Sequence, residues 1–297
     1  MESKNRNICA VLVTYNRLAL LKECLAALEK NENVAHIVIV NNKSTDGTAD
    51  YLATLSADKF IIKNSDENLG GAGGFAHGMV MAYEQTDDQY FWIMDDDTIP
   101  NSDAAHQLLD KAALLKDDFG FLCSNVRWMD GTSCNMPMPA FEWPDKINDG
   151  LVSVSQGTFV SVFLTREIVK QYGVPTQELF IWGDDTEYTI RVSQAKSSYF
   201  VIDSVVVHKT PNNLTDITIF NDSKDRINRY FYLYRNLIYI SKLYKGKGAT
   251  IKLTIRHILY AFSTLGKAKD SRFKRAGAIL KGTFTGLGFN PQIRRVD

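Results

Sequence analysis

A regular alternation of strand-like and helix-like segments in the first third of the chain constrains the fold most. Short apolar runs rich in β-branched residues predict buried strands, and runs with apolar residues at helical spacing predict helices. The expected strands are residues 8–17, 35–42, 59–64 and 90–97. The expected helices are residues 18–30, a helix that follows a turn within 44–55, and a helix that follows a glycine-rich loop within 68–85. This alternation favours an open α/β sheet with helices on both faces. Ligands of such sheets bind beyond the carboxyl ends of the strands.

The pattern is less regular after residue 101. We expect helices at 102–116, 166–175 and 221–244, a helix that starts among acids within 180–194, strands at 120–128, 151–165 and 199–210, and an irregular segment at 129–150. The chain beyond the long aromatic helix is basic. The sequence therefore predicts one domain over residues 1–220 and an aromatic and basic helical region over residues 221–297.

Composition narrows the class of protein. The chain has 297 residues, of which 45% are hydrophobic and 23% charged, and this suits a globular protein with a sizeable core. Its four cysteines share no CxxC spacing, so neither a zinc site nor a redox motif is indicated. Unpaired thiols and no leader predict a reducing, cytoplasmic location. No apolar run approaches the roughly 20 residues of a membrane-spanning helix.

The net charge of zero hides an asymmetry. From Lys242 to the end there are 13 Lys and Arg residues against two acids, a local charge of +11, so the preceding part carries −11. Such a split indicates a polyanionic partner. Residues 254–287 mix apolar and cationic residues at helical intervals, which suits a helix on an anionic membrane surface, although a solvated helical face is the plainer alternative. Nucleic acid is not expected, because no recognition module is present.

Three consecutive carboxylates, Asp95, Asp96 and Asp97, follow the apolar end of the fourth expected strand. An isolated acidic triplet is more often a surface turn. The functional alternative is a divalent-metal site, because Mg²⁺ and Mn²⁺ prefer carboxylate oxygens and bridge them to the phosphates of a ligand. In an extended chain Asp95 and Asp97 point to one side and Asp96 to the other. Taken alone, the triplet leaves both interpretations open.

Three other features are individually modest. NLGGAGGF (68–75) opens a helix after a strand, where bare amides favour an anionic ligand, but it fits neither a Walker loop nor GxGxxG. WGDDTEY (182–188) is an acidic cluster that suits either a helix N-terminus or a site with a general base. His208 ends an apolar strand, where a lone histidine is more often structural than a metal ligand.

Together these segments resemble the family 2 glycosyltransferases with the nucleotide-diphospho-sugar transferase fold, called GT-A. The resemblance covers about residues 7–240 and rests on VTYNR (13–17), VNNKSTDGT (40–48), NLGGAGGF (68–75), MDDDT (94–98), WGDDTEY (182–188) and His208. Within this family the chain looks most like bacterial galactofuranosyltransferases, with rhamnosyltransferases as close relatives. The resemblance implies a Rossmann-like mixed sheet flanked by helices, with a helical basic C-terminal extension.

The resemblance also implies which residues bind the donor. They are Thr14, Tyr15, Arg17, Asn41, Asn68, Gly70, Gly71, Asp95, Asp96 and Trp182. Thr14, Tyr15 and Arg17 would line the nucleotide pocket at the end of the first strand. Asn41 stands where the family usually has an Asp that contacts the base, and an amide can still hydrogen-bond a pyrimidine. Trp182 would also shape the acceptor site.

The metal ligands and the catalytic base follow from the same resemblance. Asp95 and Asp97 would be the DxD carboxylates that bind Mn²⁺ or Mg²⁺, and His208 would be a further metal ligand. Asp185 would be the catalytic base, with Asp184 beside it in place of the commoner Glu. The metal would stabilise the leaving nucleotide diphosphate, and Asp185 would take the acceptor proton in a single inverting displacement.

The expected activity is transfer of galactofuranose from UDP-galactofuranose to a polyprenyl-diphosphate-linked glycan in bacterial polysaccharide assembly. The enzyme would work as a peripheral protein at the inner face of the cell membrane, and a homo-oligomer is compatible with the sequence. The nearest alternative is a rhamnosyltransferase that uses dTDP-rhamnose. An alternative of another class is a scaffold that binds a sugar nucleotide without transferring it, against which the two complete acidic clusters count.

Overall fold

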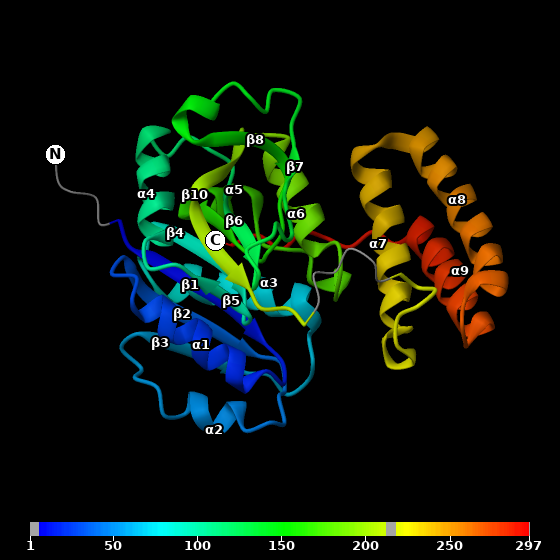
Figure 1. Cartoon of the computed structure of the whole chain (residues 1–297), viewed down its shortest axis with the longest axis horizontal. Helices are drawn as coiled ribbons and strands as arrows, with labels where there is room; N and C mark the ends of the chain where they lie inside the picture. The colour runs from blue at the N-terminus through cyan, green and yellow to red at the C-terminus, as the bar shows by residue number, and fades with distance from the viewer. Residues whose placement is uncertain (1–5, 212–217, 297) are drawn as a thin grey trace. The chain divides into compact units, whose positions relative to one another are not determined.

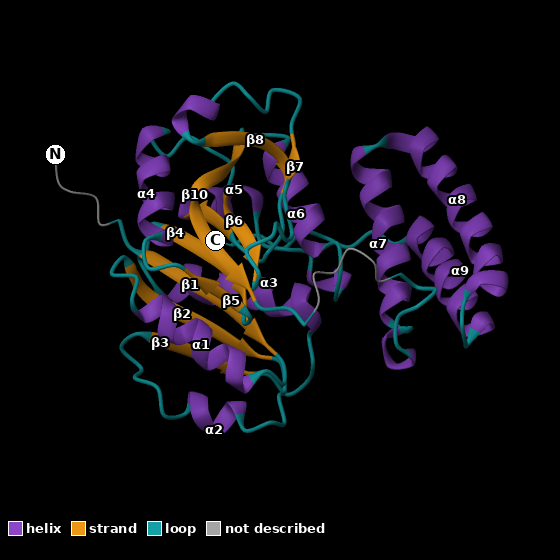
Figure 2. Cartoon of the chain, in the orientation of Figure 1, coloured by secondary structure: helices purple, strands orange, loops and turns teal. Residues whose placement is uncertain are grey.

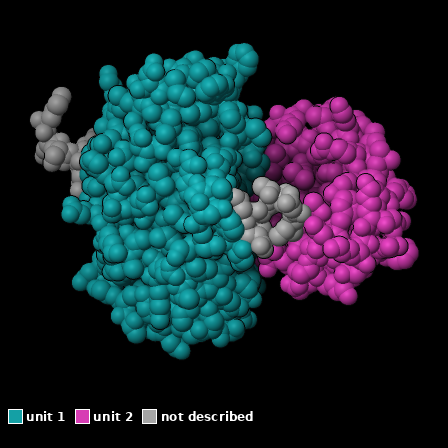
Figure 3. Space-filling view, in the orientation of Figure 1, with its two compact units in different colours: residues 1–177, 185–213, 293–297 teal, residues 178–184, 214–292 magenta. Residues whose placement is uncertain are grey.

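The computed structural model describes residues 6–211 and 218–296. The chain divides into two compact units, coloured separately in Figure 3. The first consists of residues 1–177, 185–213 and 293–297, and the second consists of residues 178–184 and 214–292. The sequence suggested a single boundary at residue 220. In the structure the second unit also includes a short segment before the acidic motif, and the last residues of the chain belong to the first unit.

The first unit is built on one mixed sheet (Figures 1 and 2). Among the described residues its strands are β1 (Ile8–Thr14), β2 (Val34–Asn41), β3 (Phe60–Asn64), β4 (Tyr90–Asp95), β5 (Thr98–Pro100), β6 (Leu122–Trp128), β7 (Met138–Pro139), β8 (Leu151–Gln156), β9 (Val162–Thr165) and β10 (Ser198–His208). Their order is β3-β2-β1-β4-β9-β6-β10-β8-β7, and β5 pairs with β10. β3, β2, β1 and β4 are mutually parallel, so their carboxyl ends meet at one edge.

Helices cover both faces of this sheet, as the alternation in the sequence predicts. They are α1 (Leu18–Glu29), α2 (Thr48–Leu52), α3 (Gly70–Gln85), α4 (Ala104–Leu114), α5 (Arg166–Tyr172) and α6 (Asp184–Ser193). Successive residues of β1 point to opposite faces. Ala10 and Leu12 join a core with side chains of α1 and α4, whereas Cys9 and Val11 join another core with side chains of α3, α5 and α6. The four cysteines are free and buried.

Two glycines of α3, Gly74 in the NLGGAGGF segment and Gly78 after it, bring α3 close to the sheet. A Cβ atom at Gly74 would lie 2.5 Å from a methyl carbon of Val13, and one at Gly78 would lie 2.7 Å from a methyl carbon of Val11. Both distances are too short for a side chain, so these positions require glycine for packing against β1. The glycine-rich sequence therefore serves the contact between α3 and the sheet, at least in part.

The segment 151–165 differs from the single strand that its sequence predicts. It forms β8 and β9, which lie in separate places in the sheet: β8 pairs with β10, and β9 lies between β4 and β6. The break falls at Gly157, whose N–H donates to Thr189 Oγ1 of α6 at 3.1 Å. Phe159, after the break, packs edge-on against Phe75 of α3. These contacts with α3 and α6 replace strand pairing over residues 157–161.

The second unit contains the helices α7 (Arg229–Tyr244), α8 (Gly246–Lys267) and α9 (Arg272–Gly288). Its core includes Tyr230 and Tyr234 of α7, Ala261 of α8, and Ile279 of α9. The backbones of α7 and α9 approach closely at two glycines of α9. A Cβ atom at Gly282 or Gly286 would lie 2.4 or 2.7 Å from a backbone oxygen of α7. Small residues therefore set the spacing of these two helices.

The basic segment that the sequence suggested as one helix over residues 254–287 is two helices. The chain leaves α8 at Lys267 and begins α9 at Arg272. At this turn Ser271 has a left-handed backbone with a φ of +46°, and the buried Arg275 binds the carbonyl and carboxylate oxygens of Asp270. No helix among the described residues is both long enough and apolar enough to cross a membrane.

Candidate active site

The predicted site residues of the first unit gather beyond the carboxyl ends of the strands. Thr14 ends β1 and lies opposite Asn41, which ends β2. On the other side of β1, Val13 lies opposite Asp95, which ends β4. His208 ends β10, and its ring contacts the loop that follows β4. Four strand ends that are far apart in the sequence thus contribute to one region of the molecule.

Two carboxylates and one imidazole of this region form a candidate metal site. Asp95, Asp97 and His208 each offer a ligand atom, and these atoms lie within 4.8 Å of one another. His208 Nε2 lies 3.1 Å from Asp97 Oδ1, and the two residues are 4% and 1% exposed. Carboxylate oxygens suit Mg²⁺ and Mn²⁺, and imidazole nitrogen suits the transition metal. This set of ligands therefore fits a divalent cation.

The electrostatics of the triplet also favour a cation. Burial, together with the charge of Asp97, raises the pKa of Asp95 to about 8. Burial raises the pKa of Asp96 to about 6, even though Arg17 lies nearby. Burial acts against ionisation of Asp97 too, but the hydrogen bond and charge of His208 hold its pKa below the usual value. The same hydrogen bond raises the pKa of His208 despite its burial.

Asp96 has different partners from Asp95 and Asp97. Its Oδ2 accepts a hydrogen bond from Thr14 Oγ1 at 2.7 Å, and its Oδ1 lies 3.3 Å from Arg17 Nη1. The same guanidinium nitrogen also pairs with Asp97 Oδ2. Arg17 is 44% exposed in its side chain, so it reaches from the surface to the buried carboxylates. Arg17 and Thr14 thus fix the position of Asp96 at the end of β1.

Asn135 also belongs to this region, and the sequence analysis does not predict it. Asn135 Oδ1 lies 3.0 Å from His208 Nδ1, on the opposite side of the ring from Asp97. The carboxamide oxygen can only accept, so it favours the tautomer with a proton on Nδ1 and leaves Nε2 free to bind a metal. Asn135 lies in an irregular segment and has a φ of +47°. No periodicity or motif marks such a residue, and its contact with His208 spans 73 residues.

The other predicted donor-binding residues of the first unit lie just after β1, at the end of β2 and at the start of α3. Asn41 is 2% exposed: its Nδ2 donates to Asn64 at 2.8 Å, and its Oδ1 accepts from the N–H of Ser44 at 3.1 Å. Asn68 Oδ1 accepts from the N–H of Gly70, which has a φ of +69°. These asparagines order the loops around the strand ends. The remaining two predicted residues are Tyr15, which is 45% exposed, and Gly71, which is partly buried.

The two acids at the start of α6 belong to different units. Asp185 lies in the first unit, where its Oδ1 accepts from the N–H of Thr186 at 2.6 Å and burial raises its pKa. Asp184, which is 7% exposed, belongs to the second unit. In the same unit the ring of Trp182 meets Tyr230 edge-on, with centroids 5.2 Å apart.

Glu187, the third acid of this cluster, has a structural role. It is fully buried, and its carboxylate binds Arg191 through two hydrogen bonds of 3.0 and 2.8 Å. Thr176 Oγ1 donates to the same carboxylate at 3.2 Å. A buried carboxylate with this many partners holds α6 in place. Of the acids in WGDDTEY, the two at the start of the helix remain as candidates for chemistry.

Comparison with known sequences matches part of the chain to a known family. Residues 9–142 match the family described as "Glycosyl transferase family 2". Residues 9–142 form a family 2 glycosyltransferase domain. It is 28% identical over 197 residues to galactofuranosyltransferase GlfT1 and 24% identical over 297 residues to galactofuranosyltransferase GlfT2, both of Mycolicibacterium smegmatis. These matches cover 61% and 85% of the chain, but only 63% and 44% of the two relatives.

Another relative of this glycosyltransferase domain is matched over most of its length. The chain is 23% identical over 271 residues to dTDP-rhamnosyl transferase RfbF of Shigella flexneri, and the match covers 86% of each protein. It is 30% identical over 199 residues to galactofuranosyltransferase GlfT1 of Mycobacterium tuberculosis, covering 61% of the chain and 62% of that relative.

Solved structures confirm the expected GT-A fold. GalNAc-T7 with UDP, GalNAc and Mn²⁺ superimposes with a TM-score of 0.64 at 13% identity, over 97% of this chain and 57% of that one. The mannosyltransferase PcManGT from Pyrobaculum calidifontis, in complex with GDP-Man and Mn²⁺, gives 0.55 at 14% identity, over 95% and 87% of the two chains. The triplet and His208 lie at strand ends of this fold, where α/β sheets bind ligands.

Proposed function

We propose that the chain is an inverting, metal-dependent transferase that moves galactofuranose from UDP-galactofuranose to a lipid-linked glycan during assembly of a bacterial cell-surface polysaccharide. The main support for metal-dependent transfer is the cluster of Asp95, Asp97 and His208, whose ligand atoms lie within 4.8 Å of one another. The galactofuranosyltransferases among its relatives support the choice of donor sugar.

The residues around the triplet would bind the diphosphate end of the donor. Asp95, Asp97 and His208 would hold Mn²⁺ or Mg²⁺, which when bound neutralises the diphosphate and the nucleotide diphosphate that leaves. Asp96, fixed by Thr14 and Arg17, would face the sugar. The nucleoside would lie over the ends of β1 and β2.

Asp185 is the proposed general base. Burial raises its pKa, so the carboxylate accepts a proton more readily than an exposed aspartate does. It would take the proton of the acceptor hydroxyl while that oxygen attacks the anomeric carbon. The bond between the anomeric carbon and the diphosphate oxygen breaks, and the electron pair leaves with the nucleotide diphosphate. One such displacement inverts the configuration without a covalent intermediate.

A rhamnosyltransferase that uses dTDP-rhamnose is the second candidate. The match to RfbF supports it, because that relative is covered over 86% of its length. Both donors present a pyrimidine and a diphosphate, so the same metal site and base would serve either. The choice between them depends on the base and the sugar, where Asn41 replaces the usual aspartate.

The acceptor and the location form the last part of the proposal. A polyprenyl-diphosphate-linked glycan requires the enzyme to work at a membrane surface, and we place it at the inner face of the cell membrane. The excess of cations from Lys242 onward supports this location.

A thermal-shift panel tests the donor assignment. The protein is melted with UDP-galactofuranose, dTDP-rhamnose and GDP-mannose, with Mn²⁺ or with EDTA, because a ligand raises the melting temperature according to its affinity. We expect the largest shift with UDP-galactofuranose and Mn²⁺, and its loss in EDTA. A larger shift with dTDP-rhamnose would replace the galactofuranosyl proposal with the rhamnosyl one.

An Asp185→Asn variant tests the mechanism. Turnover should fall by about 10²–10⁴, the usual contribution of a general base, while the donor-induced thermal shift stays unchanged. An Asp58→Asn variant, which alters an exposed carboxylate of the same unit, should keep full activity. Loss of donor affinity on the scale of the lost activity would exclude the base assignment.

A further inference from the structure

Helix α8 packs Tyr260 and Leu265 against the core of the second unit, but it exposes most of its other large apolar residues. The residues that it buries are Thr250, His257, Ala261 and Thr264. The large apolar residues that it exposes are Ile251, Ile255, Leu259 and Phe262, with exposed fractions of 61, 54, 65 and 65%. A helix on the surface of a globular protein normally has the opposite arrangement, with apolar residues toward the core. This arrangement indicates that the outward side of α8 meets a second apolar environment.

The exposed apolar residues of α8 form a continuous stripe. At about 100° per residue, Ile251, Ile255, Leu259 and Phe262 fall within an arc of about 80°, and the buried residues lie on the other side of the helix. Exposed cations flank the stripe: Lys247 lies on one side, and Lys252 and Arg256 lie on the other.

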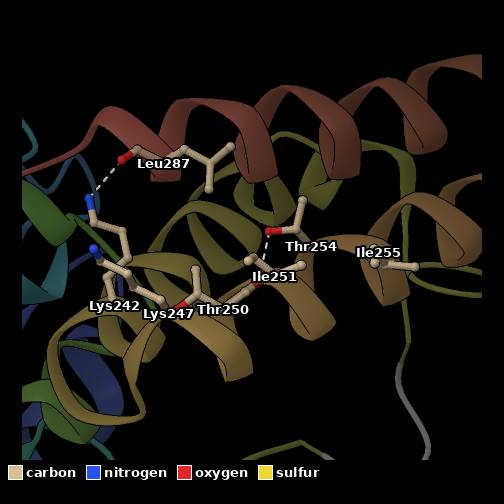
Figure 4. A pocket seen from close by; sticks show the side chains of 7 residues that line it. All are labelled: Lys242, Lys247, Thr250, Ile251, Thr254, Ile255 and Leu287. Atoms are coloured by element: carbon tan, nitrogen blue, oxygen red, sulfur yellow. Dashed lines mark hydrogen bonds between the residues drawn. The ribbon is translucent and has the colours of Figure 1, made fainter.

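Helix α9 extends this apolar surface. Phe273, Phe284 and Leu287 are 85, 55 and 44% exposed and lie on one side of α9, because their spacings of 11 and three residues are helical repeats. Leu287 joins Ile251 and Ile255 in lining a groove of about 540 Å³ between the two helices (Figure 4). At one end of the groove Lys242 donates hydrogen bonds to the carbonyl oxygens of Leu287, in the last turn of α9, and of Phe289, just after it. We call the stripe, the groove and these residues of α9 the outer apolar face.

The charges around the outer apolar face are almost all positive. Residues 246–288 include nine Lys and Arg residues and a single acid. Eight of these cations are exposed: Lys247, Lys252, Arg256, Lys267, Lys269, Arg272, Lys274 and Lys281. The acid, Asp270, is paired with the ninth cation, the buried Arg275. The cations of residues 246–288 therefore complement an anionic surface, and within this range the one acid, Asp270, is already paired with Arg275.

We propose that the outer apolar face docks on an anionic lipid bilayer, with α8 lying in the plane of the membrane. Ile255, Leu259 and Phe262 would enter the boundary between headgroups and acyl chains, while Lys252 and Arg256 extend to the phosphates. A second copy of the chain fits this face less well, because two such faces would oppose like charges. The proposal concerns membrane binding alone and holds for any sugar donor.

Vesicle co-sedimentation of the full-length protein tests the apolar part of the proposal. The vesicles contain either phosphatidylcholine alone or equal parts of phosphatidylcholine and phosphatidylglycerol. We expect binding to the anionic vesicles and little to the neutral ones. Replacing Ile255, Leu259 and Phe262 with Gln should weaken this binding by more than about tenfold, since three exposed apolar side chains no longer enter the lipid. The matched control is Phe141→Gln, which alters a 96% exposed apolar residue of the first unit and should bind like wild type.

Charge reversal tests the electrostatic part. Lys252→Glu with Arg256→Glu should weaken binding to the anionic vesicles by at least about 25-fold, because each cation near such a membrane is worth a factor of about five. Lys30→Glu with Lys170→Glu, two exposed lysines of the first unit, should leave binding unchanged. Equal binding by all variants, or equal binding to neutral vesicles, would overturn the proposal.

Two further measurements separate this proposal from the others. Analytical ultracentrifugation without lipid should give the same mass for wild type and the triple Gln variant; a dimer that the variant abolishes would show that the face binds a second copy, and would overturn the lipid proposal. The donor-induced thermal shift should be the same in both proteins. That shift tests the transferase proposal independently, so either proposal can fail while the other holds.

Discussion

At the scale of single residues, the three adjacent aspartates have three different environments. Asp96 is held by Thr14 and Arg17, whereas Asp97 binds His208. Asp95 belongs to the same potential ligand set as Asp97 and His208. The alternation of an extended chain predicts that the first and third aspartates share a side. This shared side is the part of the arrangement that can be predicted from the sequence. The partners of each carboxylate depend on β1 and β10, which no local pattern specifies.

Asn135 is expected to act as a positioning residue for His208. An Asn135→Gly variant keeps the left-handed backbone but removes the oxygen that orients the imidazole, so Mn²⁺ affinity should fall by about 10–100-fold. Asn135→Asp keeps an acceptor and should stay near wild type. Isothermal titration calorimetry with Mn²⁺ measures both without turnover. Equal affinity of the Gly variant and wild type would assign Asn135 a purely structural part.

At the scale of elements, a buried histidine makes the second unit sensitive to acid. His257 of α8 is 4% exposed; its Nδ1 lies 3.0 Å from Thr283 Oγ1 of α9, and Tyr234 of α7 meets its ring edge-on. Burial and the charge of Arg256 lower its pKa from 6.5 to about 4. Between these values the unfolded chain takes up a proton that the folded unit does not. Stability should therefore be complete above about pH 6.5 and fall toward pH 4, by about 3 kcal/mol at most.

Urea unfolding of the full-length protein at a series of pH values between these limits measures this loss. His257→Gln retains a polar side chain at the interface but cannot take up the proton. Its stability should therefore change less over the same range. A parallel decline in both proteins would assign the effect to other groups.

The elements themselves were predictable to different degrees. The α/β half follows from the sequence because buried parallel strands are continuous apolar runs and the helices between them are amphipathic. The break inside 151–165 was missed because Gly157 is its main local signal, and its cause is a hydrogen bond to Thr189 of a distant helix. The break between α8 and α9 was missed because no proline marks it. Such breaks depend on tertiary contacts, which periodicity does not record.

At the scale of the whole molecule, the end of the chain contributes to the core of the first unit. Val296 is 8% exposed and packs within the core that includes side chains of α3 and α5. The N–H of Val174 donates to the carbonyl of Arg294 at 3.0 Å. Gly173 has a φ of +77°, and a Cβ atom there would lie 2.4 Å from the same carbonyl oxygen. Arg294 and Val296 therefore pack at a defined position on the first unit.

A Val296→Ser variant should lower the free energy of unfolding by about 1–2 kcal/mol, because a buried apolar side chain becomes polar. Ile293→Ser is the matched control: Ile293 is 37% exposed, so its replacement should cost less. Urea unfolding at neutral pH measures both. If the two variants proved equally stable, the burial of Val296 would contribute little to the first unit.

The chain passes from one unit to the other four times. This connectivity limits how a unit of one such protein can be replaced by the corresponding unit of a relative. A C-terminal region taken from one relative and joined to another at a single point near residue 213 would leave residues 178–184 with the wrong helices and would bring a foreign terminal segment to the first unit. A working chimera has to transplant residues 178–184 and 214–292 together and retain residues 293–297 of the host. Recombination at one junction should therefore rarely yield a folded hybrid, and the two units are expected to change together in evolution.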